Sequence, residues 1–139
     1  MARTTFTGPV ASKNGFISGH QVTTNNAINA SATASAAQVA TGYITSTSAS
    51  PTTITLPTGT DLGNLIGAGQ GTVLDLYIDN TAGASAVTVA VNTNAILSTA
   101  AADTAGSFGD LTIAAGVTGL ARYTLMFSSA TAYVFTRTA

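Results

Sequence analysis

The most clearly patterned stretch of the chain is TVLDLYIDNTAGASAVTVAVN, residues 72–92. In its first half Leu74, Leu76 and Ile78 alternate with polar or aromatic residues, and in its second half valines alternate with Thr and Ala. Apolar residues at every second position are typical of a strand with one buried face. The linker between the halves, NTAGAS, contains Asn and Gly, which adopt turn conformations readily. This stretch therefore predicts a β-hairpin.

Shorter strand patterns lie on both sides of the predicted hairpin. Residues 41–47 and 52–56 precede it, and residues 109–114, 117–128 and 131–137 follow it. Turn residues separate these segments, so the chain contains about seven or eight short strands at regular spacing. This spacing predicts an all-β fold, namely a β-sandwich or a jelly-roll-like barrel of short antiparallel strands.

The strongest single strand is predicted at residues 117–128, and residues 131–137 form the last one. The apolar face of these two strands consists of Ala121, Tyr123, Leu125, Phe127, Tyr133 and Phe135. Residues 61–66 predict one helical turn, with Thr60 or Asp61 as its cap, that would close one end of the fold. In the alanine-rich loop after residue 92 we expect Ile96 and Leu97 to pack inward.

Charged residues are rare in this chain of 139 residues, a length that indicates one domain. They make up 6% of the chain, against about a quarter in ordinary domains, and the net charge is −1. Four Lys and Arg residues cannot form the basic surface that binds nucleic acid. No basic amphipathic helix for a membrane surface is evident. The composition therefore favours a protein that packs against other proteins, with no nucleic-acid or membrane partner.

Cysteine is absent, which excludes disulfides and thiolate metal sites. The first ten residues, MARTTFTGPV, lack the apolar core of a secretory signal, and no run of about 18 apolar residues predicts a transmembrane helix. We therefore expect synthesis in a cytoplasm, followed by use there or release by lysis. On this expectation the Asn-Ala-Ser triplet at residues 29–31 is not glycosylated.

Residues 1–36 differ from the rest of the chain because no sustained periodic pattern runs through them. We interpret them as an extended N-terminal arm and residues 37–139 as the β-domain, with a disordered tail as the alternative. The arm is favoured because a plain linker has no need of spaced Phe and Ile side chains. Residues 30–40, rich in Ala, Ser and Thr, favour a hinge over a helix. The candidate partner-binding anchors of the arm are Phe6, Val10, Phe16, Ile17, Val22 and Ile28.

Candidate catalytic residues are sparse. The single histidine, His20, lies in the predicted arm and not on a scaffold that holds it beside a serine and an aspartate. The loop GNLIGAGQG, residues 63–71, lacks both GK[ST] and the GxGxxG spacing of nucleotide-binding loops. Asp75 and Asp79 share one strand face about 13 Å apart, which is too far for a hydrolytic carboxylate pair. We therefore predict no enzyme and no cofactor.

Calcium and carbohydrate sites are weaker alternatives. The aspartates considered as oxygen ligands for Ca²⁺ are Asp75, Asp79, Asp103 and Asp110. No calcium-loop spacing joins them, so we predict no metal site and expect some of them to pair with Arg122 or Arg137. The tyrosines considered as a carbohydrate-stacking surface are Tyr43, Tyr77, Tyr123 and Tyr133. Such residues more often keep the ring in the core and the hydroxyl in water.

Several segments together resemble those of known virion proteins. The opening TTFTGPVASKNGF is similar to the start of small virion proteins of tailed phages. The further segments that carry the resemblance are TITLP (53–57), LYIDN (76–80), AVTVA (86–90), GLARYTLMF (119–127) and AYVF (132–135). Their order is similar to that in the β-domains of tailed-bacteriophage capsid decoration (cement) proteins and head-fibre proteins. The turn NTAG departs from the family pattern because its Gly is displaced.

The resemblance implies a structural protein of the virion surface, without enzymatic activity. Such a protein binds the major capsid protein, stabilises the head and commonly forms a homo-oligomer, with a trimer favoured. The arm would reach over neighbouring capsid subunits and pair with their strand edges. Two alternatives stay open: a phage fibre or receptor-binding β-domain that recognises a host glycan, and a self-assembling tail or filament subunit.

Overall fold

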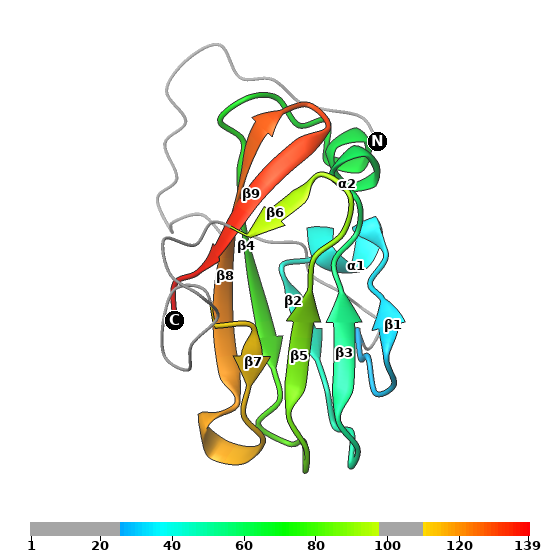
Figure 1. Cartoon of the computed structure of the whole chain (residues 1–139), viewed down its shortest axis with the longest axis vertical. Helices are drawn as coiled ribbons and strands as arrows, with labels where there is room; N and C mark the ends of the chain where they lie inside the picture. Colours follow the sequence, from blue (N-terminus) through cyan, green and yellow to red (C-terminus); the bar gives the residue numbers. More distant parts are fainter. Residues whose placement is uncertain (1–25, 98–109) are drawn as a thin grey trace, which may run out of the picture.

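A computed structural model of the chain describes residues 26–97 and 110–139 (Figure 1). These residues form short strands, two α-helices and one 3-10 helix. In chain order the elements are β1 (Ala32–Thr33), α1 (Ala36–Ala40), β2 (Tyr43–Thr45), β3 (Thr52–Thr55), α2 (Gly59–Ile66), β4 (Val73–Asp79), β5 (Val87–Ala90), β6 (Ala95–Leu97), β7 (Thr112–Ile113), η1 (Gly116–Thr118), β8 (Leu120–Ser129) and β9 (Ala132–Arg137).

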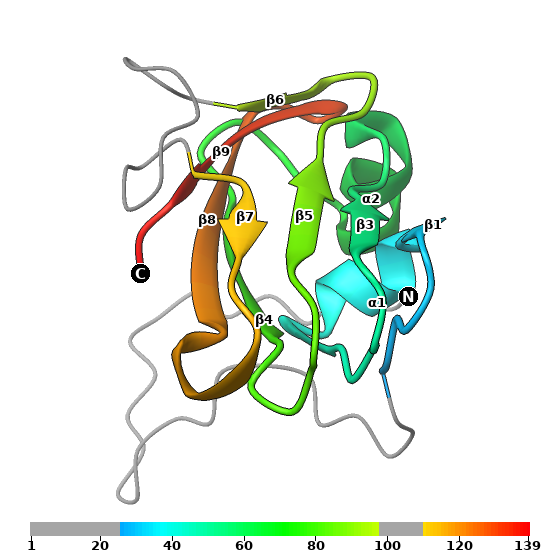
Figure 2. The same ribbon diagram turned by 60° about the horizontal axis from the view of Figure 1, so that its bottom comes forward.

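The strands form two sheets that share one core, and Figure 2 shows them as separate layers. One sheet has the order β1-β3-β5-β7 and the other the order β2-β4-β8-β9-β6. The expectation of a mostly β fold is confirmed. The expectation of purely antiparallel strands is wrong, because β1–β3, β3–β5, β2–β4 and β6–β9 are parallel pairs.

The mixed sheets follow from the path of the chain. Successive strands β2, β3, β4 and β5 alternate between the two sheets. Each return to the same sheet therefore runs through the opposite layer, and this long connection permits a parallel neighbour where a tight turn would not. The tight β8–β9 connection, in contrast, gives an antiparallel pair.

The predicted hairpin over residues 72–92 is wrong in its pairing, although the alternation within each half is right except at Val91, which is 50% exposed. β4 pairs with β2 and β8, whereas β5 lies in the other sheet between β3 and β7. The linker crosses from sheet to sheet and is held by the buried Asn80, whose side-chain amide donates to Ser85 O and Ala114 O, each at 2.9 Å. Because the two sheets bury their inner faces in one core, a crossover and a hairpin produce the same apolar alternation.

The centre of the core comes from β8 and β9, as the sequence predicts. Tyr123, Phe127, Tyr133 and Phe135 are fully buried. Their rings meet in tilted or edge-to-face pairs at centroid distances of 5.4–6.3 Å. Such pairs add to the stabilisation that burial of their apolar area provides.

Helix α2 confirms the helical turn predicted at residues 61–66 but begins earlier, so the prediction of Thr60 or Asp61 as its cap is wrong. Thr58 is its N-cap, and the Thr58 hydroxyl oxygen accepts from the Asp61 amide at 3.0 Å. The helix lies against the β8–β9 turn at a glycine, because a Cβ on Gly63 would collide with Ala130 O. This close approach requires a residue without a side chain.

The hinge interpretation of residues 30–40 is wrong, because they contain β1 and α1. Ser35 stands at the N-cap of α1, where its hydroxyl accepts from the Gln38 amide and the Gln38 side chain accepts from the Ser35 amide. In the interior of a helix a serine competes with the helical hydrogen bonds, whereas at the N-cap it stabilises the helix. The inward packing expected of Ile96 is also wrong, because β6 turns Ala95 and Leu97 toward the core and leaves Ile96 exposed.

Candidate functional site

The most distinctive surface in the described part of the chain is the outer face of the five-stranded sheet, which points away from the core. Strand alternation places every second side chain on it. Those that are exposed or half-buried there include Tyr43, Val73, Asp75, Tyr77, Asp79, Ile96, Leu120, Arg122, Thr124, Met126, Val134 and Thr136. The strand register arranges most of them in rows that run across the sheet.

The first row is apolar and crosses four strands. Val73 on β4 is the register partner of Met126 on β8, which pairs with Val134 on β9, which pairs with Ile96 on β6. Val73, Met126 and Ile96 are 54%, 53% and 57% exposed, and Val134 between them is half-buried. We call these four residues the apolar row.

The second row is polar and lies beside the apolar row. It contains Asp75, Thr124 and Thr136, which are register partners on β4, β8 and β9. The Thr124 hydroxyl donates to Asp75 Oδ1 at 2.7 Å, and Arg122 Nη2 lies 2.8 Å from Asp75 Oδ2. The hydrogen bond from Thr124 and the neighbouring Arg122 charge hold the pKa of Asp75 below its usual value.

The third row is aromatic. Tyr43 on β2, Tyr77 on β4 and Arg122 on β8 are successive register partners, and the Arg122 guanidinium lies 5.9 Å from the centroid of the Tyr77 ring. The Tyr43 hydroxyl donates to Asp79 Oδ2 at 2.6 Å, and Thr81 donates to Asp79 Oδ1 from its hydroxyl and its amide. These bonds, Thr81 first and Tyr43 second, lower the pKa of Asp79.

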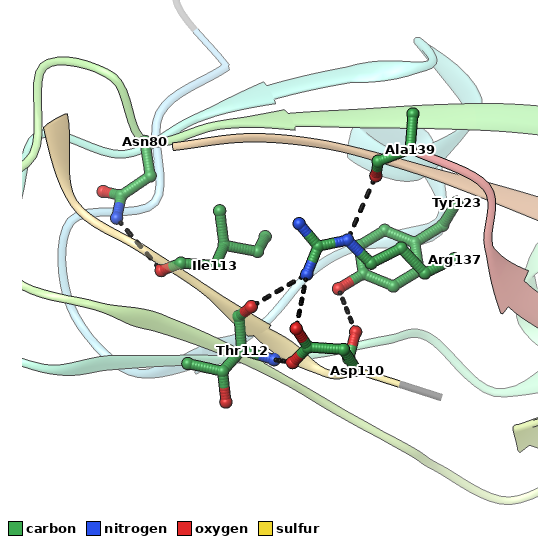
Figure 3. A network of polar contacts seen from close by, with 7 residues as sticks. All are labelled: Asn80, Asp110, Thr112, Ile113, Tyr123, Arg137 and Ala139. Carbon is green, nitrogen blue, oxygen red and sulfur yellow. Dashed lines mark hydrogen bonds and ion pairs between the residues drawn. The ribbon is translucent and has the colours of Figure 1, made fainter. Parts of the chain in front are cut away.

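A second polar cluster connects β8 and β9 of the five-stranded sheet with β7 of the other sheet (Figure 3). Arg137 Nη1 on β9 lies 3.0 Å from Asp110 Oδ2 and donates to Thr112 O on β7, also at 3.0 Å. The Tyr123 hydroxyl donates to Asp110 O at 3.2 Å. The cluster therefore ties the two sheets together, and its groups are engaged with one another.

These contacts bear on two alternatives from the sequence, namely a calcium site on the aspartates and a carbohydrate-stacking surface on the tyrosines. Within residues 26–97 and 110–139 no three His, Cys, Asp or Glu side chains group as metal ligands. The expected pairing of aspartates with Arg122 and Arg137 is confirmed. The buried Tyr123 and Tyr133 donate to backbone carbonyls, whereas Tyr43 and Tyr77 are on the outer face. Asp103 and His20 lie outside the described residues.

The arm anchors are placed only in part. Phe6, Val10, Phe16, Ile17 and Val22 lie outside the described residues. Ile28 is 6% exposed and belongs to the core cluster. Its amide donates to Thr45 O at 2.9 Å, and the Thr45 amide donates to Asn26 O at 3.1 Å, so residues 26–28 run along the edge of β2.

The apolar row was not predicted from the sequence. Its members are flanked in the chain by polar residues or by residues that are buried or half-buried, so each looks like an isolated surface residue. One indication was present in the sequence. Val73 and Met126 occupy alternate positions of their strands that point to the face opposite the predicted apolar face. Only the register between strands brings the four side chains into line.

Comparison of the chain with protein-family models, with curated proteins and with solved structures found no match. In the described residues no helix is long and apolar enough to cross a membrane.

Proposed function

We propose that this chain is a structural virion protein that decorates and cements the exterior of a capsid by binding the major capsid protein. The observation that carries this proposal is that, within residues 26–97 and 110–139, the few charged side chains are bound to other groups of the chain itself. A shell protein works at high local concentration, where many weak, uncharged contacts add up. Within the same proposal we class the fold as a β-sandwich, because two separate sheets share one core.

The charged side chains of the described residues all have partners. Asp75 binds Arg122, and Asp110 binds Arg137. Asp79 accepts from Tyr43 and Thr81, and Asp61 accepts from the Thr58 hydroxyl at 2.7 Å. Charges satisfied in this way add little to the solubility of a free protein and raise no repulsion between neighbours packed side by side.

The base of the proposed arm is attached firmly to the domain. The Asn26 side-chain amide donates to Gln38 O, Thr41 Oγ1 and Tyr43 O at 3.0, 2.9 and 2.7 Å. With Ile28 in the core, a partner held by residues 1–25 would be held through β2 and the five-stranded sheet. In this proposal Phe6, Val10, Phe16, Ile17 and Val22 contact the capsid, whereas Ile28 fixes the arm.

The experiment is co-sedimentation of the purified chain with particles stripped of it. Full-length chain is compared with a chain that lacks residues 1–25, a boundary chosen because residues 26–36 belong to the fold. A matched control replaces the five anchors by Ser in the full-length chain. Saturable binding that both changes weaken by about tenfold or more supports binding to the capsid through the arm. Absence of binding by the full-length chain overturns the proposal.

A second candidate, recognition of a host glycan by a fibre domain, is favoured by the third row. Tyr43 and Tyr77 present partly exposed rings on adjacent strands, beside the carboxylates of Asp75 and Asp79. Sugars commonly stack on such rings and hydrogen-bond to such acids. Binding to immobilised glycans that Tyr43→Ala removes, with Val117→Ala as the control, would establish this function in place of the first.

A further inference from the structure

We propose that the domain binds one enclosed structural water molecule between Ser46 and Asn80, at the end where two segments cross from one sheet to the other. This inference does not depend on the capsid proposal, because it concerns the interior of the domain. It starts from two buried side-chain oxygens, Ser46 Oγ and Asn80 Oδ1, that have no hydrogen-bond partner among the residues that the structure describes.

The two crossing segments lie next to each other. Residues 46–51 lead from β2 to β3, and residues 80–86 lead from β4 to β5. Both segments are at the end of the domain from which β3 and β5 start (Figure 1). The Ala84 amide donates to Ser48 O at 3.0 Å, so the segments are fixed to each other. A space between them therefore has a defined shape.

Strand register places Ser46 beside Asn80. The strands β2 and β4 are parallel, Thr45 is the register partner of Asp79, and the Ser46 amide donates to Asp79 O at 2.8 Å. The next residues along the two strands are therefore neighbours whose side chains point to the same face. Ser46 is 1% exposed and Asn80 is 0% exposed, so this face is the core side.

The Asn80 side chain is held in an orientation that leaves its oxygen unpaired. Its amide nitrogen donates to Ser85 O and Ala114 O, each at 2.9 Å. Figure 3 shows the same nitrogen directed toward Ile113 O. These bonds use the donors of the side chain and leave Oδ1 as a free acceptor. A side chain at Gly83 would collide with this oxygen, so Gly83 covers it without filling the space beside it.

The spacing of the two oxygens suits a single water molecule. Neighbouring strands lie about 4.8 Å apart. Two hydrogen bonds of about 2.8 Å that share one water span up to about 5.5 Å. The water donates to Asn80 Oδ1, which has only acceptor capacity, and it bonds to the Ser46 hydroxyl, which both donates and accepts. Enclosed waters in proteins typically bind buried polar groups that the chain leaves unpaired.

A metal cation suits this position poorly. Ser46 and Asn80 are neutral, and the neighbouring carboxylate of Asp79 accepts from Tyr43 and Thr81 on the outer face. A cation requires several oxygen ligands and, in a buried site, a compensating negative charge. The site therefore takes a small neutral ligand that can donate a hydrogen bond.

The first test is a crystal structure of the full-length chain at a resolution that shows ordered water. We expect one water within about 2.7–3.2 Å of both Ser46 Oγ and Asn80 Oδ1. A direct contact between these two oxygens in that range would overturn the proposal. So would a gap between them that protein atoms fill, or a density peak with the oxygen contacts of about 2.4 Å that indicate a cation.

The second test counts long-lived water molecules in solution by water-oxygen magnetic relaxation dispersion of the full-length chain. Ser46→Val should lower the count by one, because the additional methyl group takes the place of the water. The matched control is Ser48→Val, since the Ser48 hydroxyl donates directly to Ser50 O at 2.8 Å and its loss should release no water.

Equal counts in the wild type and in Ser46→Val would overturn the proposal, as would the same decrease in both variants. If Ser46→Val does not fold, the crystal structure of the unchanged chain still decides between the two outcomes.

Discussion

Arg137 on β9 and Asp110 beside β7 form an ion pair at 3.0 Å that joins the two sheets across the edge of the core. The side chains are 18% and 9% exposed, so this pair is largely desolvated. The other ion pair, Arg122 with Asp75, is 2.8 Å long but has side chains that are 39% and 38% exposed. Two pairs of similar length therefore differ mainly in burial.

Arg137→Gln should lower the free energy of unfolding by about 2 kcal/mol or more, because it leaves the Asp110 carboxylate buried without its cation. Arg122→Gln is the matched control and should change stability little, since water replaces the lost partner at an exposed site. Urea unfolding of both variants at pH 7 measures the difference. Equal losses would show that burial does not separate the two pairs.

Asn80→Asp should make stability depend on pH in a new way. The Asn80 amide donates to Ser85 O and Ala114 O, so a carboxylate there would face carbonyl oxygens in a buried site. Both effects raise the pKa of the introduced carboxyl above its unfolded value of about 4. The variant should be nearest to wild type below pH 4 and lose stability as the pH rises through the folded-state pKa.

At pH 7 we expect Asn80→Asp to lower the free energy of unfolding by about 3 kcal/mol or more. Thermal unfolding between pH 3 and pH 8 measures this dependence. Asn29→Asp is the control, because the Asn29 side-chain oxygen accepts from the Thr47 amide at 2.8 Å and a carboxylate keeps that bond. A similar pH profile for both variants would contradict the role assigned to Asn80.

The Asp75 carboxylate on the outer face should contribute less to the stability of the fold at acid pH. The hydrogen bond from Thr124 lowers the pKa of Asp75, so the stabilisation is present above the unfolded pKa and is lost as the pH falls through the folded one. Thr124→Val should therefore reduce the drop in melting temperature between pH 5 and pH 2. Thr53→Val, whose hydroxyl is outside this cluster, should leave the drop unchanged, and an equal reduction there would refute the assignment.

Gly63→Ala should destabilise the chain by about 2 kcal/mol, because the added methyl meets the Ala130 carbonyl where α2 packs on the β8–β9 turn. Gly69→Ala provides the comparison, since a Cβ there has nothing within 4 Å. That variant should stay within about 0.5 kcal/mol of wild type in the same unfolding measurement. If both variants unfold alike, the close approach at Gly63 is not what limits the helix position.

The faces of the strands could be predicted from the sequence, whereas their partners could not. Alternation places Leu76, Ile78, Tyr123 and Phe127 in the core, because successive side chains of a strand point to opposite faces and one of these faces is shielded from water. Strand pairing depends on contacts between segments that are distant in the sequence, and the local residue pattern does not specify these contacts. The Asn80 crossover shows this, since its Asn and Gly fit a hairpin turn equally well.

The candidate site was even less accessible to sequence reasoning. Tyr43 and Tyr77 were recognised as a possible binding surface, but so were Tyr123 and Tyr133, which lie in the core. These tyrosines differ in whether their strand face points to the core or to solvent, and this depends on the tertiary structure. The apolar row has no local pattern at all, because its members come from four strands.

The alternation of successive strands between layers also constrains the order in which the chain can fold. β8 is the centre of the five-stranded sheet, and its partner β4 lies about fifty residues earlier, with Asp75 and Arg122 separated by 47 positions. Contacts so distant along the chain make folding slow. On the ribosome β2 and β4 have no completed sheet to join until β8 and β9 have been made. We therefore expect the domain to form in one late, cooperative step and not layer by layer during synthesis.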